Sequence, residues 1–166
     1  MMVSIARRFS LALAVTLIAS TAAAQDSGIE IGKMAPAAAV QTLDGKAADL
    51  SQFIGKKPVL MEFWATWCPN CRELEPTMTA MHAKYGSKVS FVGVAVSVNE
   101  DAALVKKYVA KHKLPWTQVY DAKGNATDKY DVPATSYVVV IDKTGKVVYT
   151  GVGGNQDIEA ALKKVM

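Results

Sequence analysis

Residues 58–72 decide the fold, and they read PVLMEFWATWCPNCR. Residues 58–64 form a nearly continuous apolar run that is too short to favour a helix, so they predict a strand covered on both faces of a sheet. Cys68 and Cys71 follow directly, separated by two residues. The stretch therefore predicts a buried central strand that leads into a pair of cysteines.

A helix is predicted to begin at the cysteine pair. Apolar residues recur after it at spacings of four, three and four, which is typical of one helical face. These residues are Leu74, Met78, Met81 and Tyr85, and the pattern ends at Gly86. The cysteines consequently lie between a buried strand and the start of a helix.

The position of the cysteines predicts a redox site. If Cys68 is the N-cap, Pro69 occupies the first helical position and Cys71 lies one turn further on, so the two sulfur atoms can meet. The positive end of the helix stabilises a thiolate at Cys68, which makes this residue a nucleophile. Cys71 is then placed to attack a mixed disulfide on Cys68 and release the partner.

Two other interpretations of the cysteine pair are a structural disulfide and half of a zinc site. A zinc site needs two more ligands, and the only histidines, His82 and His112, fall within predicted helical stretches without a second cysteine pair. Met78 and Met81 fit core packing better than copper binding. We therefore expect no metal and no bound cofactor.

The rest of the chain alternates strand and helix patterns. A β-α-β-α-β start that closes with β-β-α predicts an α/β fold, a mixed sheet covered by helices. The other expected elements are a hairpin at 37–50 around Asp44-Gly45, a strand at 88–96, a helix at 99–113, a strand at 117–120, a hairpin at 137–150 around Thr144-Gly145 and a helix at 157–166.

The N-terminus is typical of a secretory signal peptide at residues 1–24. Arg7 and Arg8 precede an apolar run over residues 9–19, and small residues follow at 21–24. The run is shorter than the roughly 20 residues that span a bilayer core, so cleavage is preferred over the alternative of an uncleaved membrane anchor. We expect export to the periplasm or beyond, with residues 25–166 as one domain that is soluble after cleavage.

Composition and charge restrict the functions of this domain. The chain has 166 residues, 51% hydrophobic and 20% charged, with a net charge of +4, which is too apolar for a disordered protein. Without Arg7 and Arg8, 17 basic side chains remain against 15 acidic ones, and no basic run exceeds two residues. We therefore expect no nucleic-acid binding.

The sequence resembles the thioredoxin superfamily, and most closely its exported TlpA/ResA-type thiol:disulfide oxidoreductases, over roughly residues 30–166. The motifs that carry the resemblance are Phe63-Trp-Ala-Thr-Trp-Cys-Pro-Asn-Cys-Arg72, the preceding Gly55-Lys-Lys-Pro-Val-Leu60, Pro76, Val92-Gly-Val-Ala-Val96, Asp131-Val-Pro-Ala-Thr135 and Ile141-Asp-Lys-Thr-Gly-Lys146. The resemblance implies a thioredoxin-like fold with an N-terminal β-hairpin and a central helix-strand insertion.

The resemblance also implies a substrate-binding loop. Val132-Pro133 resembles the loop whose proline is cis and packs beside the cysteines, and whose preceding backbone pairs with an extended substrate segment. With Trp67 as an apolar rim, the predicted substrate contacts are Trp67, Pro69, Asn70, Val132 and Pro133. Asn70 stands where the family often has proline, which leaves the redox potential open.

Glu62 departs from the TlpA/ResA pattern. That group usually has Asn at this position and Glu three residues after the second cysteine, where this chain has Leu74. Thioredoxin has a buried acid at the position of Glu62, and a buried carboxyl can relay the proton of the inner thiol. We predict this role for Glu62; the alternative is a strand-end side chain that reaches solvent. Glu73 and Glu75 are interpreted as helix-surface charges, and His112 as structural.

The sequence thus predicts an exported, monomeric thiol:disulfide oxidoreductase that exchanges disulfides with partner proteins. By analogy with the family, it is a reductant that receives electrons from a membrane thiol transporter and serves cytochrome c maturation or copper-site assembly. The alternative is a copper-binding metallochaperone that uses the same dithiol. A peroxiredoxin is disfavoured, because the proline and threonine expected before its reactive cysteine are absent.

Overall fold

The structure is a computed structural model that describes residues 28–166. The predicted signal peptide lies outside the described residues. No helix within residues 28–166 has both the length and the apolar character needed to cross a membrane.

Within the described residues the strands form one mixed sheet of seven. The strands are β1 (Ala39–Thr42), β2 (Ala47–Asp49), β3 (Val59–Trp64), β4 (Ser90–Val96), β5 (Thr117–Asp121), β6 (Tyr137–Ile141) and β7 (Val147–Val152), in the order β2-β1-β5-β4-β3-β6-β7. The central β3, β4 and β5 are parallel, whereas β1, β6 and β7 pair antiparallel to their neighbours. The α/β class, both hairpins and the buried central strand are confirmed.

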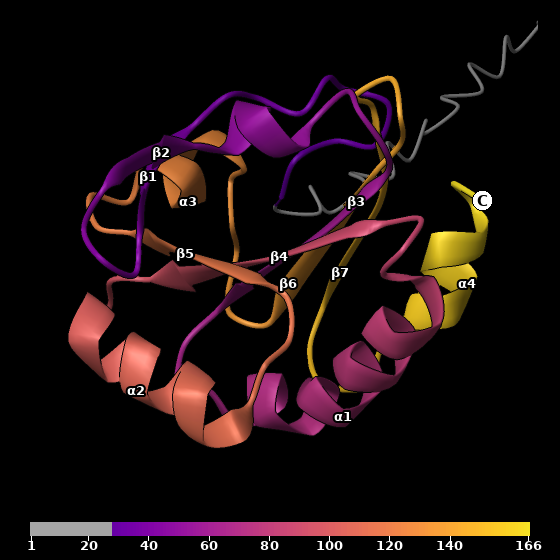
Figure 1. The fold of residues 1–166 in the computed structure, drawn as a ribbon. Helices are drawn as coiled ribbons and strands as arrows, with labels where there is room; N and C mark the ends of the chain where they lie inside the picture. The colour runs from indigo at the N-terminus through magenta and orange to yellow at the C-terminus, as the bar shows by residue number, and fades with distance from the viewer. Residues whose placement is uncertain (1–27) are drawn as a thin grey trace, which may run out of the picture.

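Helices cover both faces of this sheet (Figure 1). One face carries α1 (Pro69–Tyr85), α2 (Ala102–His112) and α4 (Ile158–Lys163), and the other carries α3 (Asn125–Lys129) and the 3₁₀ helix η1 (Leu50–Phe53). The short α3 was not predicted, because five residues are too few to show a helical period. Its first turn is held by buried Asp121, whose carboxylate accepts hydrogen bonds from Ala126 and Thr127.

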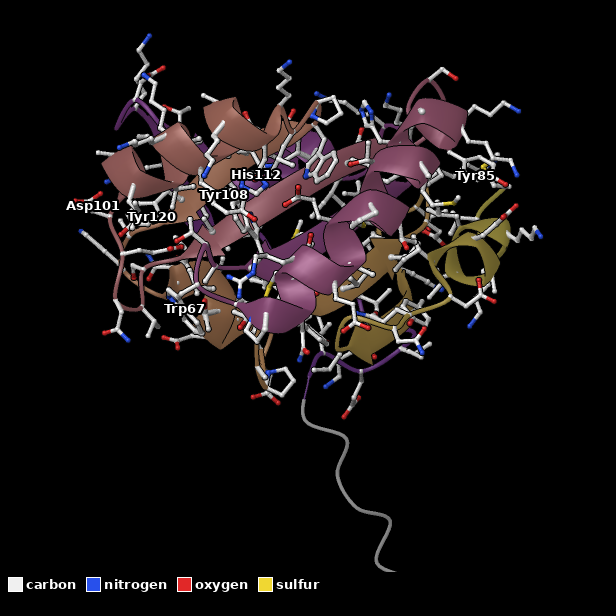
Figure 2. All side chains as sticks on the ribbon, turned by 90° about the horizontal axis from the view of Figure 1, so that it is seen from below. Trp67, Tyr85, Asp101, Tyr108, His112 and Tyr120 are labelled. Carbon is white, nitrogen blue, oxygen red and sulfur yellow. A yellow bond between two sulfur atoms is a disulfide. The ribbon has the colours of Figure 1, made fainter. Side chains whose placement is uncertain are left out.

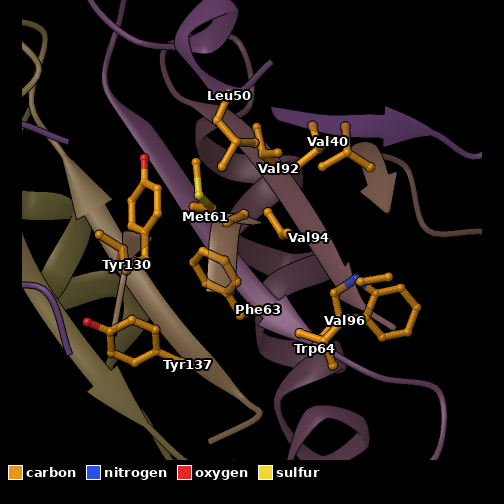
Figure 3. Close-up of a cluster of buried hydrophobic side chains, with 14 of the residues drawn as sticks. Val40, Leu50, Met61, Phe63, Trp64, Val92, Val94, Val96, Tyr130 and Tyr137 are labelled. Atoms are coloured by element: carbon orange, nitrogen blue, oxygen red, sulfur yellow. The ribbon is translucent and has the colours of Figure 1, made fainter. Parts of the chain in front are cut away.

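Two hydrophobic clusters form the core, and the first extends to both faces of the sheet, because it contains Trp64 of β3 and Val105 of α2 as well as Met61 and Phe63. Met61 and Phe63 of β3 pack with Leu50 and Tyr130 in the first cluster (Figure 3). The second cluster joins Leu60 of β3 to residues of α1 and α4, including Leu74, Met78, Ile158 and Leu162. Because strand side chains alternate between faces, Glu62 lies on the same face as Leu60, toward the helix that begins at the cysteines.

Candidate active site

Cys68 and Cys71 form a disulfide at the start of α1, with their Cα atoms 5.3 Å apart. Cys68 has extended backbone geometry and is the N-cap, and its sulfur accepts a hydrogen bond from the Cys71 amide at 3.1 Å. Pro69 begins the helix, where its missing N–H leaves no bond unmade. The predicted capping arrangement is confirmed, and the first sulfur lies at the positive end of the helix.

The two cysteines differ in what they face rather than in exposure. Cys68 is 2% exposed and Cys71 is 6% exposed, so neither sulfur is open to solvent in the disulfide form. Cys71 lines an internal cavity, whereas the sulfur of Cys68 accepts a hydrogen bond from the backbone amide of Cys71. Exposure in the disulfide form therefore does not distinguish the two cysteines, whereas their surroundings do.

Side-chain hydrogen bonds hold the loop before the cysteines, which contains Thr66 and Trp67. The Thr66 amide donates to Glu100 Oε2 at 2.9 Å, and its hydroxyl donates to the same carboxylate. Arg72 Nη1 donates to the Thr66 carbonyl at 3.2 Å, and Trp67 Nε1 donates to the Val98 carbonyl at 2.7 Å. Partial burial raises the pKa of Glu100. The sequence does not reveal the role of Glu100, because this residue lies 34 residues from its partner Thr66 and belongs to no motif.

Glu62 is buried in the middle of the sheet, with 5% of its surface exposed. Its neighbours across the sheet are Gly93 and Val138, and the Ser136 hydroxyl donates to its Oε1 at 3.0 Å. Burial raises the pKa of Glu62 to about 8, while the bond from Ser136 acts in the opposite direction. The alternative of a strand-end side chain that reaches solvent is wrong, because β3 continues to Trp64 and α1 covers this face.

Substitution of Ser136 by alanine is expected to destabilise the fold more at high pH than at low pH. Below pH 8 the lost bond joins two neutral groups, at a cost of about 1 kcal/mol, whereas above pH 8 a buried carboxylate loses its donor, at a cost of about 2 kcal/mol. Urea midpoints at pH 6 and pH 9 measure the difference. An equal loss at both values would mean that Glu62 does not ionise in this range.

One small cavity brings Cys71 and Glu62 together. It has a volume of about 10 Å³, which is about the space that a single water molecule needs. Apolar side chains form most of its wall, and three titratable groups besides the cysteine reach it. The lining residues are Glu62, Trp64, Cys71, Glu75, Tyr108, Leu114 and Trp116. The inner cysteine and the buried acid therefore face the same space.

The site consists of a disulfide at the start of a helix, next to a buried acid, on a mixed sheet. Known proteins with similar sequences and structures agree with this description. The profile of the redoxin family matches residues 30–165. The chain belongs to the redoxin family. This redoxin is 33% identical over 143 residues to the thiol-disulfide oxidoreductase ResA of Bacillus thuringiensis subsp. konkukian, an alignment that covers 85% of this chain and 82% of the relative.

Solved structures are similar to this redoxin along most of its length. A thiol:disulfide interchange protein of the thioredoxin family from Chlorobium tepidum is 27% identical, with a TM-score of 0.68 and coverage of 82% and 98% of the two chains. A secreted disulfide oxidoreductase from Mycobacterium tuberculosis, described as homologous to E. coli DsbE, is 26% identical with a TM-score of 0.65 and covers 77% and 95%. The thioredoxin-like fold and the TlpA/ResA-type resemblance are confirmed, and this redoxin is a thiol:disulfide oxidoreductase.

Glu75 of this redoxin is not an ordinary surface charge, so that expectation is wrong. Tyr108 donates to its Oε2 at 3.0 Å, and His112 Nδ1 lies 2.9 Å from its Oε1. Its side chain is only 23% exposed. Figure 2 shows Tyr108 and His112 on the side of α2 that faces α1. These partners lie 33 and 37 residues away in the sequence, so no local pattern could reveal them.

The cis peptide bond implied at Val132-Pro133 is also wrong. Within residues 28–166 the single cis bond joins Thr135 to Ser136. Ser136 directly precedes β6, and its hydroxyl donates to Glu62 Oε1 at 3.0 Å. The Val132 amide lies further back and donates to the Thr127 carbonyl at 3.0 Å at the end of α3.

The other predicted substrate contacts of this redoxin lie at the surface. Trp67 is 44% exposed and held by its indole bond to the chain at Val98, which is itself 54% exposed. Pro69, Asn70 and Pro133 are exposed as well. The surface around the disulfide thus presents the apolar indole ring of Trp67 and the polar side-chain amide of Asn70. Within residues 28–166 no group of three or more His, Cys, Asp or Glu side chains could hold a metal ion.

Proposed function

We propose that this redoxin is an exported reductant of protein disulfides, in which Cys68 is the nucleophile, Cys71 the resolving thiol and Glu62 the proton relay. The observation that supports this assignment most directly is the shared cavity. A disulfide capped by the N-terminus of α1 has its inner cysteine beside a buried carboxyl, and both line the same small space. This pair can separate thiol activation at one cysteine from proton transfer at the other.

In the first step the Cys68 thiolate attacks a disulfide of the substrate protein. A bond forms between Cys68 Sγ and one substrate sulfur, and the other substrate sulfur leaves with the electron pair as a thiolate. The Cys71 amide and the positive end of α1 stabilise the Cys68 thiolate before the attack. The product is a mixed disulfide between Cys68 and the substrate.

In the second step Cys71 resolves the mixed disulfide. The Cys71 thiol passes its proton to the Glu62 carboxylate, and the resulting thiolate attacks Cys68 Sγ, so that the second substrate sulfur leaves as a thiolate. Burial raises the pKa of Glu62 to about 8, close to that of an ordinary thiol, so proton transfer between them requires little free energy. The substrate is reduced by two electrons, and the Cys68–Cys71 disulfide forms again.

The surface around the disulfide fits an extended protein segment. Trp67 offers an exposed apolar face, and the exposed Pro69 and Asn70 border the sulfurs at the first turn of α1. We assign substrate contacts to these three residues, and to Val132 and Pro133 in the loop after α3. Proteins with accessible disulfides or dithiols are the substrate class.

Export and the source of electrons complete the proposal. A signal peptide at residues 1–24 would deliver a soluble, monomeric domain of residues 25–166 to an oxidising compartment, the periplasm. A reductant there must be reduced again after each cycle, for which we propose a membrane thiol transporter. Assembly of cytochrome c or of copper sites, where cysteines must be kept reduced, is the proposed use.

The redox state of the protein in cells tests this role. Rapid acid quenching and thiol labelling are expected to find a substantial dithiol fraction, which is lost when the membrane thiol transporter is deleted. A Cys71→Ser variant should retain substrate proteins as mixed disulfides, and a Cys68→Ser, Cys71→Ser double variant serves as the control. A fully oxidised protein in cells that retain the transporter would contradict the reductant role.

A further inference from the structure

A partly buried cluster joins α1 to α2 next to the redox site. Both carboxylate oxygens of Glu75 are engaged from α2, one by the Tyr108 hydroxyl at 3.0 Å and the other by His112 Nδ1 at 2.9 Å. The rings of Tyr108 and His112 are stacked, with centroids 3.8 Å apart and an interplanar angle of 14°. This stack fixes the imidazole against the carboxylate.

The cluster has one side in the cavity and the other at the surface. Glu75 and Tyr108 line the same cavity of about 10 Å³ as Glu62 and Cys71. The side chain of His112 is 28% exposed, so the imidazole contacts both Glu75 and solvent. Glu75, Tyr108 and His112 therefore lie between the cavity that Glu62 lines and the solvent.

The charges around the cavity determine which group carries the proton. The titratable groups that face Glu75 are Glu62 from β3 and Tyr108 and His112 from α2, and Arg72 lies one turn earlier on α1. The pKa of Tyr108 is raised to about 12, chiefly by desolvation and then by its bond to Glu75, so the phenol stays protonated and acts only as a donor. Glu75 and His112 remain as the groups that can exchange a proton.

We propose that Glu75 and His112 form the route by which the proton on Glu62 leaves for solvent. This inference rests on the proposed relay function of Glu62. The proton that Glu62 takes from Cys71 passes through one water-sized space to the Glu75 carboxylate, then to the imidazole of His112 and finally to bulk water. No bond other than O–H and N–H bonds changes, and the two electrons stay with the sulfur atoms. Tyr108 is the positioning residue for Glu75.

The test is the rate at which Cys71 resolves a preformed mixed disulfide, followed by stopped-flow tryptophan fluorescence in full-length protein. Because Glu62 holds a proton at pH 7, it must release that proton to solvent before it can accept the one from Cys71. Glu75→Gln and His112→Gln are therefore each expected to slow this resolution step about tenfold at pH 7 in dilute buffer. High concentrations of imidazole buffer should restore the rate, because a small base can accept the proton instead. A purely structural role for the cluster would not produce rescue by buffer.

Glu73→Gln is the matched control, since it removes a neighbouring exposed acid of α1 that does not line the cavity. It should show the native rate and no dependence on buffer concentration. Alkylation of Cys68 in reduced Glu75→Gln should also match the native rate. Native kinetics without buffer dependence in both Glu75→Gln and His112→Gln would overturn the route. If Glu62→Gln is slow while Glu75→Gln and His112→Gln are not, only the route is overturned and the proton relay by Glu62 stands. Native kinetics in Glu62→Gln would overturn both the relay and the route.

Discussion

Substitution of Cys68 by serine is expected to lower the rate of disulfide reduction at least ~10³-fold, because the hydroxyl cannot form the mixed disulfide. Cys71→Ser should retain the first step and lose the second, so the enzyme accumulates as a covalent complex with its substrate. Mass spectrometry after incubation with a disulfide-bonded peptide measures both outcomes. A mixed disulfide on Cys71 in the Cys68→Ser variant, formed at the native rate, would reverse the assignment.

Alkylation of the reduced protein provides a second measure of the same asymmetry. The two cysteines are similarly buried in the disulfide form, at 2% and 6% exposure. The N-terminus of α1 stabilises the thiolate at Cys68 only, and Cys71 faces the buried acid. Iodoacetamide should therefore modify Cys68 well below pH 8.5 while Cys71 reacts slowly. Equal rates at both thiols would contradict a role for the helix terminus.

The central part of the fold could be predicted because its signals are local. The apolar run of β3, the adjacent cysteine pair and the helical period of α1 occupy neighbouring residues, and each has one structural interpretation. Capping by Cys68 could be expected from the helical period after the cysteines together with Pro69, which favours the first helical position. Glu62 could be assigned to a buried position because it interrupts a run in which every other residue is apolar.

The features that the sequence did not predict depend on contacts between distant residues. Glu75 looks like a surface charge until α2 packs beside α1 and supplies Tyr108 and His112. Glu100 lies after β4 and reaches the loop before the cysteines only because β3 and β4 are parallel neighbours. The motif at residues 131–135 did not predict the cis bond, which lies between Thr135 and Ser136.

Substitution of Glu62 by glutamine is expected to stabilise the fold, and to do so more strongly as pH rises. The pKa of Glu62 is about 8 in the folded protein and about 4.5 when unfolded. Between these values the folded state holds a proton that the unfolded state has lost, so the stability of the native protein falls as pH rises from 4.5 to 8. Glutamine does not titrate, and the variant lacks this loss.

The gain from Glu62→Gln should therefore be small near pH 5 and reach roughly 5 kcal/mol above pH 8, where the native protein buries a carboxylate. Glutamine retains an oxygen that can accept the hydrogen bond from the Ser136 hydroxyl. Urea denaturation of both proteins at pH 5, 7 and 9 measures the difference. Glu73→Gln, which alters an exposed acid, should change stability by less than about 0.5 kcal/mol at every pH.

Glu62→Gln should change the free energy of unfolding and the rate of resolution in opposite directions. A stable core favours a neutral side chain at residue 62, whereas a proton relay requires one that can ionise. A neutral amide removes the cost of burying charge, but it also leaves Cys71 without a base in the cavity. Glu62→Gln should accordingly be more stable than the native protein and yet resolve the mixed disulfide about 10²-fold more slowly at pH 7, with unchanged alkylation of Cys68. A variant that is more stable and equally fast from pH 6 to 9 would show that the buried acid has no part in proton transfer.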